Sequence, residues 1–390
     1  MAKKILIISN KVVFPSMDGG AVAMQKLAKN LISQSYQLDI ICINKNDTLK
    51  SMSKKYLKLE KNQITQTQIQ KNMSFNLLIF ITSIIKQKAY QATRFYDLEI
   101  QNMIQEKIDN NKYTAIIFES IFTTIYLNKL IFHNNPQIIL RAHNIEHKIW
   151  KNLARHTISK KLVFLLLAKQ IKKMEKEIPK YVDYIFTLSE KDQQYFQNIF
   201  PKKTHNIPVT FDIENISHKK IRNSIVHLGA MDWKPNTEGI SWFLQNVHPQ
   251  LEDEDIKIYI AGKNMPKKYF NYVSPNTVIE GAVKNAKNYI KNKEVVFVPL
   301  LSGSGIRIKI LESMALGIPV VSTRKGAEGI PYTDRKNIFI ANSPLEFKNA
   351  LCILIQNKQL AAQIGKEGQR LIQERFSDQI VIKKLRHILQ

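Results

Sequence analysis

Short, largely apolar runs alternate with amphipathic stretches along the first half of the chain. Runs of this kind are typical of strands that are covered on both faces in a parallel sheet. The strands that we expect here are 4–8, 38–43, 115–118, 138–142 and 183–188. Segments such as 21–33 and 189–200 place apolar residues at helical spacing between them, and Ser189 is a suitable N-cap. This alternation predicts a doubly wound parallel sheet.

A second series of the same kind begins near residue 225. Its expected strands are 225–228, 256–261, 277–280, 295–298, 319–322 and 337–341. Between the two series, residues 201–224 consist largely of Pro, Lys, Asn and Ser with little periodicity. We therefore expect an N-terminal domain over 1–205, a linker over 206–224 and a C-terminal domain over 225–376. The amphipathic stretch 377–390 is expected to reach back to the first domain.

The composition agrees with two folded domains and narrows the setting. The chain has 390 residues, of which 44% are hydrophobic, enough to fill two cores and to exclude a disordered or disulfide-stapled chain. Its two cysteines, Cys42 and Cys352, lie in apolar runs, which favours a reduced interior. The longest apolar stretches fall well short of the roughly 20 residues that span a bilayer, and residues 5–8 are too short for a secretory signal. We expect a cytoplasmic protein.

The charge points to an anionic partner. There are 58 basic and 32 acidic residues, a net charge of +26, which attracts nucleic acid, an anionic membrane or a nucleotide. Because the lysines are scattered rather than blocked, A/T-rich codon usage is an equally good explanation. The sequence shows no helix-turn-helix, zinc pattern or aromatic–basic platform, so we expect no nucleic-acid partner.

Two segments leave a membrane contact open. The apolar segment 75–85 is flanked by Lys71, Lys86 and Lys88, which suits either an acceptor- or membrane-facing element or a buried helix. A later segment carries four lysines at helical spacing, which would suit anionic headgroups or simply a solvated helix face. These are Lys169, Lys172, Lys173 and Lys176. Association with the inner face of the cell membrane is therefore an alternative to a freely cytoplasmic location.

The most informative motif lies at 298–322. A strand is expected to end near Pro299, a glycine loop follows over 302–305, and a helix then begins whose N-terminus would favour an anion. Glu312 lies seven residues after Gly305, two turns along the same helix face, and Lys309 lies one turn before it. A diphosphate at the helix N-terminus would bring the adjoining ribose to Glu312. The alternative is an ordinary surface ion pair between Lys309 and Glu312.

These residues resemble a known family. The run Gly-Ser-Gly-Ile-Arg-Ile-Lys-Ile-Leu-Glu from Gly303, continued through 323 and by Gly-Ala-Glu-Gly at 326–329, is similar to the donor signature of family-4-type glycosyltransferases, the retaining group 1 enzymes of the GT-B fold. The likeness extends to 227–236, to Trp242-Phe243 and to 141–146. It implies two Rossmann-like domains facing across a cleft. The C-terminal one would hold a nucleotide sugar, and the N-terminal one the acceptor.

The resemblance also assigns roles to single residues. It implies that Gly303, Ser304, Gly305 and Glu312 bind the donor. Arg307 and Lys309 would neutralise the leaving diphosphate, and Lys234 would take the place of the family's donor-site lysine. Two departures stand out: Met231 or a neighbour replaces the family's usual arginine, and Ser304 stands where many relatives carry a first glutamate. The identity of the sugar is therefore open.

Two further candidates lie in the first half. Gly19 and Gly20 follow the first expected strand, where resembling enzymes bring a glycine loop against the donor phosphate; an ordinary strand–helix turn is the alternative. His143 follows the strand 138–142 at its carboxyl end, where ligands of such sheets bind. By resemblance His143 would face the reacting sugar and orient it.

Two patterns could instead indicate a metal. Residues 143–147 match H-x-x-E-H, the inverted zinc-peptidase motif, with His143 and His147 expected on one helical face, but no third ligand is evident. Residues 253–255 match D-x-D but precede the expected strand 256–261, which puts them at the wrong edge of the sheet. We expect neither a metal nor another cofactor.

Together these features predict a metal-independent glycosyltransferase. It would move a hexose-type unit, with retention, from a nucleoside-diphosphate donor to a glycan or lipid-linked acceptor in envelope or polysaccharide synthesis. The alternatives are a nucleotide-sugar epimerase, because the same fold hosts that chemistry, and a non-catalytic basic binding protein.

Overall fold

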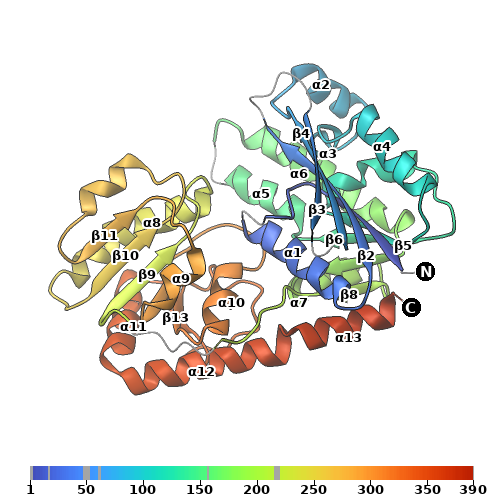
Figure 1. Cartoon of the computed structure of the whole chain (residues 1–390). Coiled ribbons are helices and arrows are strands. Elements are labelled where there is room, and N and C mark those ends of the chain that lie inside the picture. The colour runs from blue at the N-terminus through green and yellow to red at the C-terminus, as the bar shows by residue number, and fades with distance from the viewer. Residues whose placement is uncertain are drawn as a thin grey trace. The chain divides into compact units, whose positions relative to one another are not determined.

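The chain folds into two compact units, shown in Figure 1 in a computed structural model. The structure describes residues 3–15, 18–46, 53–59, 63–155, 158–214 and 220–389. One unit comprises Met1–Val209 together with Val381–Gln390, and the other comprises Thr210–Ile380. Each contains a doubly wound α/β sheet, so the predicted fold class is confirmed.

The sheet of the N-terminal unit has eight strands in the order β3-β4-β2-β1-β5-β6-β7-β8. All neighbours run parallel except β3, which is antiparallel to β4. Their bounds are β1 Lys4–Ser9, β2 Gln37–Lys45, β3 Ser53–Leu59, β4 Ile64–Lys71, β5 Tyr113–Glu119, β6 Gln137–Ala142, β7 Tyr184–Thr187 and β8 Thr204–Asn206. The five strands expected from apolar runs are present. The additional strands β3, β4 and β8 lack such a run.

Strand β4 shows why pattern alone missed it. Its Gln66 and Thr67 are polar yet buried, because the Gln66 amide accepts from the Phe14 N–H (2.9 Å) and donates to the Phe14 carbonyl (2.7 Å). A buried polar side chain is tolerated when its hydrogen bonds are made. The strand therefore sits in the sheet without a continuous apolar run.

Helices cover this sheet, and several begin at a polar cap. Asp18, Asn76, Asp97 and the predicted Ser189 each accept a hydrogen bond from the first turn of the helix that follows. The helices are α1 Gly19–Ile32, α2 Leu77–Ile85, α3 Tyr90–Thr93, α4 Leu98–Asp109, α5 Glu146–Arg155, α6 Lys161–Glu177 and α7 Glu190–Gln197, with a 3-10 helix η1 over Ile121–Lys129. Alternate residues of β1 enter different cores: Leu6 and Ile8 lie in one cluster, Ile5 and Ile7 in another.

The amphipathic end of the chain packs on this N-terminal sheet. Helix α13 spans Asp378–Ile388, and its Val381 and Leu385 lie in the same apolar cluster as Ile5 and Ile7. The Tyr36 hydroxyl donates to the Leu389 carbonyl (3.3 Å).

The stretch expected to be a loose linker is in part well packed. Ile207 and Val209 are buried, with Ile207 in a core cluster of the N-terminal unit. Phe211 is also buried, and its N–H donates to the Phe376 carbonyl (2.9 Å). This short Ile-Pro-Val-Thr-Phe run supplies the apolar side chains that our interpretation of 206–224 overlooked.

The C-terminal unit has six parallel strands in the order β11-β10-β9-β12-β13-β14. They are β9 Ser224–Leu228, β10 Lys257–Ala261, β11 Thr277–Glu280, β12 Val295–Val298, β13 Val320–Ser322 and β14 Phe339–Ile340. The helices are α8 Lys234–Asn246, α9 Ala286–Lys291, α10 Ile308–Ala315, α11 Pro344–Gln356 and α12 Lys358–Arg375. At the core, the rings of Phe243 and Phe297 stack with centroids 4.3 Å apart.

Register decides which loops meet. In the C-terminal sheet Leu228 lies opposite Ala261, and Val298 lies opposite Ser322, so the loops after these strands share one edge. The D-x-D residues 253–255 precede β10 and therefore lie at the opposite edge, as expected. There the Asn223 side chain donates to the Asp255 carboxylate (2.8 Å).

Candidate functional site

The loop between β12 and α10 requires glycine at two positions. Gly303 and Gly305 have φ values of 101° and 81°, in the left-handed region that other residues rarely adopt. A Cβ at position 303 would also lie 2.8 Å from Arg307 Nη2 and 3.1 Å from Cζ2 of Trp233. The order of strand, glycine loop and helix predicted from the sequence is confirmed, with α10 beginning at Ile308.

Arg307 holds this loop closed. Its Nη1 donates to the carbonyl oxygens of Ser304 and Gly305, the latter at 2.6 Å, and its Nη2 donates to that of Ser302 (3.4 Å). The buried guanidinium lies over the Trp233 ring, 5.1 Å from its centroid. Burial lowers the pKa of Arg307 to about 10, against the opposing charge of Glu328. Arg307 thus positions the loop. From the sequence we predicted only that Arg307 would neutralise the diphosphate, and not this structural role.

Helix α10 begins directly after the glycine loop. Arg307 occupies the N-cap position, but no side chain caps the helix there. The first N–H groups of a helix lack partners within it and, with the helix dipole, favour an anion. The geometry therefore provides backbone donors at the place where the sequence predicted a diphosphate.

Lys309 lies in a cage made by three segments of the C-terminal unit. Its Nζ donates to Oδ1 of Asn236 in α8 (3.0 Å) and lies 3.5 Å from Nε2 of His227 in β9. A Cβ at position 229 would lie 2.5 Å from the same Nζ, so Gly229 leaves room for the ammonium group. The hydrogen-bond partners of Lys309 are therefore an amide and an imidazole.

The protonation states in this cage follow from burial. Burial, and next the nearby Arg307 charge, lower the pKa of Lys309 to about 7, while Glu312 acts in the opposite direction. Burial and the Lys309 charge lower the pKa of His227, whose Nδ1 lies 3.0 Å from the Phe297 carbonyl. A carbonyl only accepts, so His227 donates through Nδ1 and presents Nε2 as an acceptor to Lys309. An anion bound here would favour the charged lysine.

The remaining predicted donor residues have varied surroundings. Glu312 lies one turn beyond Lys309 on α10 and is half-buried. Lys234 begins α8 with an exposed side chain, and Ser304 lies half-buried in the glycine loop. Met231 lies in the apolar core of the C-terminal unit, so it does not take the place of the family's arginine.

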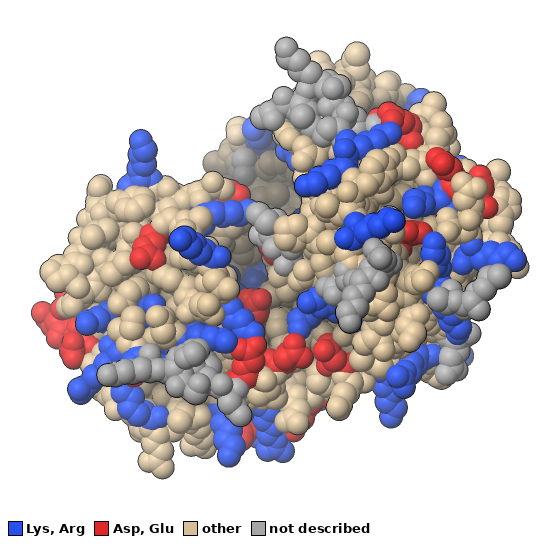
Figure 2. Space-filling view, in the orientation of Figure 1, with Lys and Arg blue, Asp and Glu red and all other residues tan. Residues whose placement is uncertain are grey.

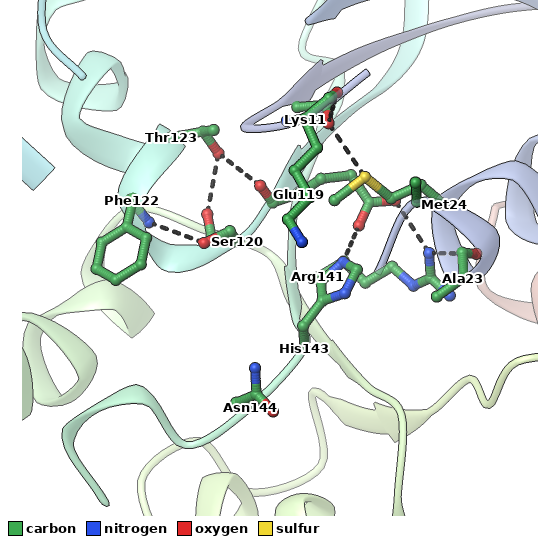
Figure 3. A network of polar contacts seen from close by, with 12 residues as sticks. Lys11, Ala23, Met24, Glu119, Ser120, Phe122, Thr123, Arg141, His143 and Asn144 are labelled. Atoms are coloured by element: carbon green, nitrogen blue, oxygen red, sulfur yellow. Dashed lines mark hydrogen bonds and ion pairs between the residues drawn. The ribbon is translucent and has the colours of Figure 1, made fainter. Parts of the chain in front are cut away.

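The N-terminal unit has its own polar network, shown in Figure 3. Glu119 at the end of β5 contacts Nε2 of His143 through Oε2 (2.6 Å) and accepts from Nη1 of Arg141 through Oε1 (3.0 Å). Arg141 Nη1 also donates to the Ala23 carbonyl (3.0 Å). Parallel pairing of β5 with β6 sets Glu119 opposite Arg141, which brings the three side chains together.

Glu119 is a buried carboxylate that fixes the orientation of His143. Burial alone would raise the pKa of Glu119, but the charges and hydrogen bonds of Arg141 and His143 outweigh it and lower the pKa. Because an ionised carboxylate only accepts, Nε2 of His143 carries the proton. The carboxylate therefore holds the ring in a defined tautomer. His143 itself is partly exposed and lies at the carboxyl end of β6. Sequence reasoning identified His143 but missed Glu119. The available signal was an acidic residue directly after an apolar run that was expected to be a strand.

Gly19 and Gly20 form the first turn of α1. The Asp18 carboxylate caps this helix by accepting from the Ala21 N–H (2.9 Å), and its other oxygen pairs with Lys11 Nζ (2.7 Å). A Cβ at position 20 would lie 3.2 Å from that Nζ, so Gly20 makes room for the Lys11–Asp18 pair. Contact of these glycines with a phosphate stays a prediction.

The H-x-x-E-H pattern does not form a helical pair. Helix α5 begins at Glu146, so His143 precedes it, and the prediction of one shared helical face is wrong. His147 contacts the Glu175 carboxylate through Nδ1 (2.6 Å), whereas His143 contacts Glu119. Among the residues that the structure describes, no group of three or more His, Cys, Asp or Glu side chains could hold a metal ion.

Comparisons with known proteins agree with these observations. Residues 222–357 match the family model described as glycosyl transferases group 1. The chain is 24% identical over 398 residues to a Klebsiella pneumoniae protein named as an uncharacterized 44.6 kDa protein in the cps region, covering 98% of both chains.

Solved structures share the fold over the full length. Sucrose-phosphate synthase from Thermosynechococcus elongatus has a TM-score of 0.72 at 11% identity, covering 99% of this chain and 98% of its own. TarM of S. aureus, in a complex with fondaparinux, alpha-GlcNAc-glycerol and UDP, has a TM-score of 0.69 at 13% identity over 100% of both chains. Anabaena HepE with UDP and glucose has a TM-score of 0.64 at 14% identity, covering 100% of this chain and 99% of its own.

Proposed function

We propose that this chain, a glycosyltransferase of the GT-B fold with a group 1 glycosyl transferase domain over residues 222–357, moves a hexose-type sugar from a nucleoside-diphosphate donor. The acceptor would be a glycan or a lipid-linked glycan in envelope or polysaccharide synthesis. The observation that carries the proposal is the site at α10: a glycine loop held by Arg307, a helix N-terminus without a side-chain cap, and the partly buried Lys309.

These groups suit the departure of a diphosphate. Negative charge develops on the leaving group as the sugar–oxygen bond breaks, and prearranged donors in a dry site stabilise it strongly. The α10 N-terminus would bind the diphosphate oxygens through backbone N–H groups, and Lys309 would supply the positive charge. Glu312, farther along the helix, would accept from the ribose hydroxyls.

The N-terminal unit would serve the reacting sugar and the acceptor. His143, held by Glu119, would hydrogen-bond the transferred sugar and orient it. A ring fixed in one tautomer by a buried carboxylate pays little entropy when it binds, which favours a positioning role. We propose retention of configuration from the resemblance of the donor motif.

The donor base and the metal requirement belong to the same proposal. TarM and HepE are described with UDP, which makes uridine diphosphate sugars the first donors to test. We propose that neither a metal nor another cofactor is needed, so transfer should survive exhaustive EDTA treatment. Loss of activity that Mg²⁺ or Mn²⁺ restores would contradict this. We also propose a cytoplasmic location, where nucleotide sugars are available.

A thermal-shift panel of UDP-, GDP- and ADP-sugars tests the donor site. A ligand that binds only the folded state raises the melting temperature, so one nucleotide class should stabilise the chain more than the others. Its effect should disappear in a Lys309→Met variant and persist in Lys257→Met, at the opposite edge of the same sheet. No shift with any nucleotide sugar would contradict the proposal, and conversion of the donor to an isomer without acceptor would indicate an epimerase.

A further inference from the structure

Helix α2 turns an apolar face toward solvent. The exposed residues follow helical spacing, so they form one stripe along the helix. They are Leu77, Leu78, Ile81, Ile84 and Ile85, with Leu78 and Ile85 each 74% exposed. Only Ser83 of this helix is buried. Of the two interpretations of segment 75–85, the buried helix is therefore wrong.

Contacts beside the stripe and at the start of the helix fix α2 in this orientation. Phe80 packs edge-on against Tyr90, with ring centroids 5.3 Å apart. The Asn76 N–H donates to the Tyr90 hydroxyl (3.1 Å), and the Asn76 side chain caps the helix through the Ile79 N–H (3.0 Å). The apolar stripe is thus a built feature of the surface, and contiguous exposed apolar surface of this kind marks an interaction site.

The chain segment that carries the stripe is basic, although its Lys71 pairs with Asp97 just beyond it (3.0 Å). Residues 71–96 contain four Lys or Arg and neither Asp nor Glu. Lys86 and Lys88 follow α2 directly and are exposed. Figure 2 shows basic side chains spread over the face drawn, with fewer acidic ones among them. Stretches of similar length without acids also occur at 120–145 and 256–279, so the case for α2 rests on the apolar stripe together with the lysines beside it.

Helix α6 also presents exposed apolar residues together with lysines. Its exposed face begins with Leu162 and Leu165 and continues with lysines at the same helical spacing. These are Lys169, Lys172, Lys173 and Lys176. Lys173 Nζ donates to Oε1 of Gln87 (3.0 Å), which places this basic face beside the C-terminal end of α2. Residues 158–174 also contain five Lys and no acid.

We propose that α2 and the exposed face of α6 dock the N-terminal unit on an anionic membrane surface. Apolar residues of a surface helix enter the headgroup–acyl boundary, while lysines beside it attract anionic headgroups. A second copy of this chain is a poorer occupant, because a two-fold contact would set the same lysines against one another without acids to pair them. No helix in the described part of the chain is long and apolar enough to cross a bilayer, so docking would be peripheral.

The docking face begins at the same edge of the sheet as His143, with three strands between β4 and β6. Helix α2 follows β4, and β4 runs parallel to β2, β1, β5 and β6 in turn. The start of α2 therefore lies at the edge of the sheet where the carboxyl ends of these strands meet. The inference itself concerns lipid binding alone and does not depend on the reaction catalysed.

Co-sedimentation of the full chain with lipid vesicles tests the proposal. We expect binding to vesicles of phosphatidylcholine with phosphatidylglycerol, little binding to phosphatidylcholine alone, and weaker binding as salt rises. Ile81→Ser with Ile85→Ser should lower the partition coefficient at least tenfold. The matched control, Leu98→Ser with Ile131→Ser, removes two exposed apolar residues elsewhere in the unit and should bind as the unaltered chain does.

Charge variants separate the electrostatic part. Lys86→Gln with Lys88→Gln and Lys173→Gln should weaken binding and flatten its salt dependence. Lys112→Gln with Lys202→Gln, exposed residues before β5 and β8 at the opposite edge of the sheet, should change neither. Circular dichroism should show every variant folded, because all these side chains are exposed.

Three outcomes would overturn the proposal. The unaltered chain could fail to bind anionic vesicles, or the α2 variant could bind as well as its control. Alternatively, a dimer in vesicle-free solution that the α2 variant disperses would identify a second copy as the occupant. The donor-induced thermal shift reports on the C-terminal unit and should be the same in all these variants, so failure here is distinguishable from failure of the proposed function.

Discussion

Each unit has a titratable side chain near the carboxyl ends of its strands, His143 in one and Lys309 in the other. The two side chains differ in the charge of the groups that they contact. In the N-terminal unit the buried Glu119 contacts both Arg141 and His143. In the C-terminal unit Lys309 contacts an amide oxygen and an imidazole nitrogen, neither of which is negatively charged. Accordingly, the pKa of Glu119 is lowered by its partners against the effect of burial, whereas the pKa of Lys309 falls to about 7, mainly through burial.

This difference separates a positioning network from a binding site. The Glu119 network has its own counter-charges, so it holds His143 in place without further ligand. Lys309 is a partly buried amine whose hydrogen-bond partners are neutral, and it lies in the first turn of α10. A bound anion would therefore stabilise its charged form. The comparison therefore supports the proposed division of roles, with a positioning network in the N-terminal unit and a donor-binding site in the C-terminal unit.

Replacing Glu119 should have the largest effect on stability. Glu119→Gln leaves the buried Arg141 without its carboxylate, and breaking a buried pair in this way costs about 3–5 kcal/mol. Because the folded pKa of Glu119 is lowered, its contribution is present above the ordinary carboxyl pKa and is lost as pH falls through the folded value. Denaturant unfolding at neutral and acid pH measures both effects. The exposed Glu106→Gln is the control, and equal stability of the two variants would remove the network from the account.

Replacing Lys309 should leave stability intact and lower the transfer rate. Lys309→Met removes a poorly solvated amine, so stability should stay the same or rise. The transfer rate should fall at least a hundredfold, since one preorganised donor to a developing charge contributes about 3–4 kcal/mol. Single-turnover kinetics beside unfolding curves make the measurement, with Lys257→Met as the control. A large loss of stability with unchanged turnover would reverse the assignments of the two sites.

Replacing Glu312 should affect the donor alone. A hydrogen bond to a charged group contributes about 1.5–3 kcal/mol, so Glu312→Ala should raise the donor Kd roughly tenfold or more. Calorimetry on the full chain measures this, and Glu374→Ala on the exposed face of α12 is the matched control. Unchanged donor affinity would remove Glu312 from the ribose site.

The pH dependence of donor binding should be smaller but distinctive. Lys309 in the free protein loses its proton above a pKa of about 7, and a bound diphosphate favours the protonated form. Donor affinity should therefore fall as pH rises above about 7, by less than tenfold per pH unit for one linked proton. Glu119 would impose no such dependence in this range. Equal affinity at pH 6.5 and 8.5 would contradict a Lys309 that is largely neutral in the free protein and charged in the complex.

The sequence predicted the elements whose signals are local. The buried parallel strands follow from continuous apolar runs, and the glycine loop with its helix follows from Gly303, Gly305 and the amphipathic residues after them. Strand β4 was not predicted because Gln66 is polar but buried, its hydrogen bonds being made to Phe14, far away in sequence.

The site was predicted only as far as its members are neighbours in sequence. Lys309 and Glu312 were found on one helix, but Asn236 and His227, which hold Lys309, come from other segments. Glu119 joins His143 only through the pairing of two strands. The H-x-x-E-H alternative required both histidines on one helix, but His143 lies between the end of β6 at Ala142 and the start of α5 at Glu146.

Proton uptake on donor binding tests the central claim most directly. Calorimetric titration of the preferred nucleotide diphosphate near pH 8, repeated in buffers of different ionisation enthalpy, gives the number of protons bound with the ligand. We predict uptake of close to one proton by the unaltered chain and close to none by Lys309→Met. Binding without proton uptake, or the same uptake in both proteins, would contradict a diphosphate site in which Lys309 becomes charged when the donor binds.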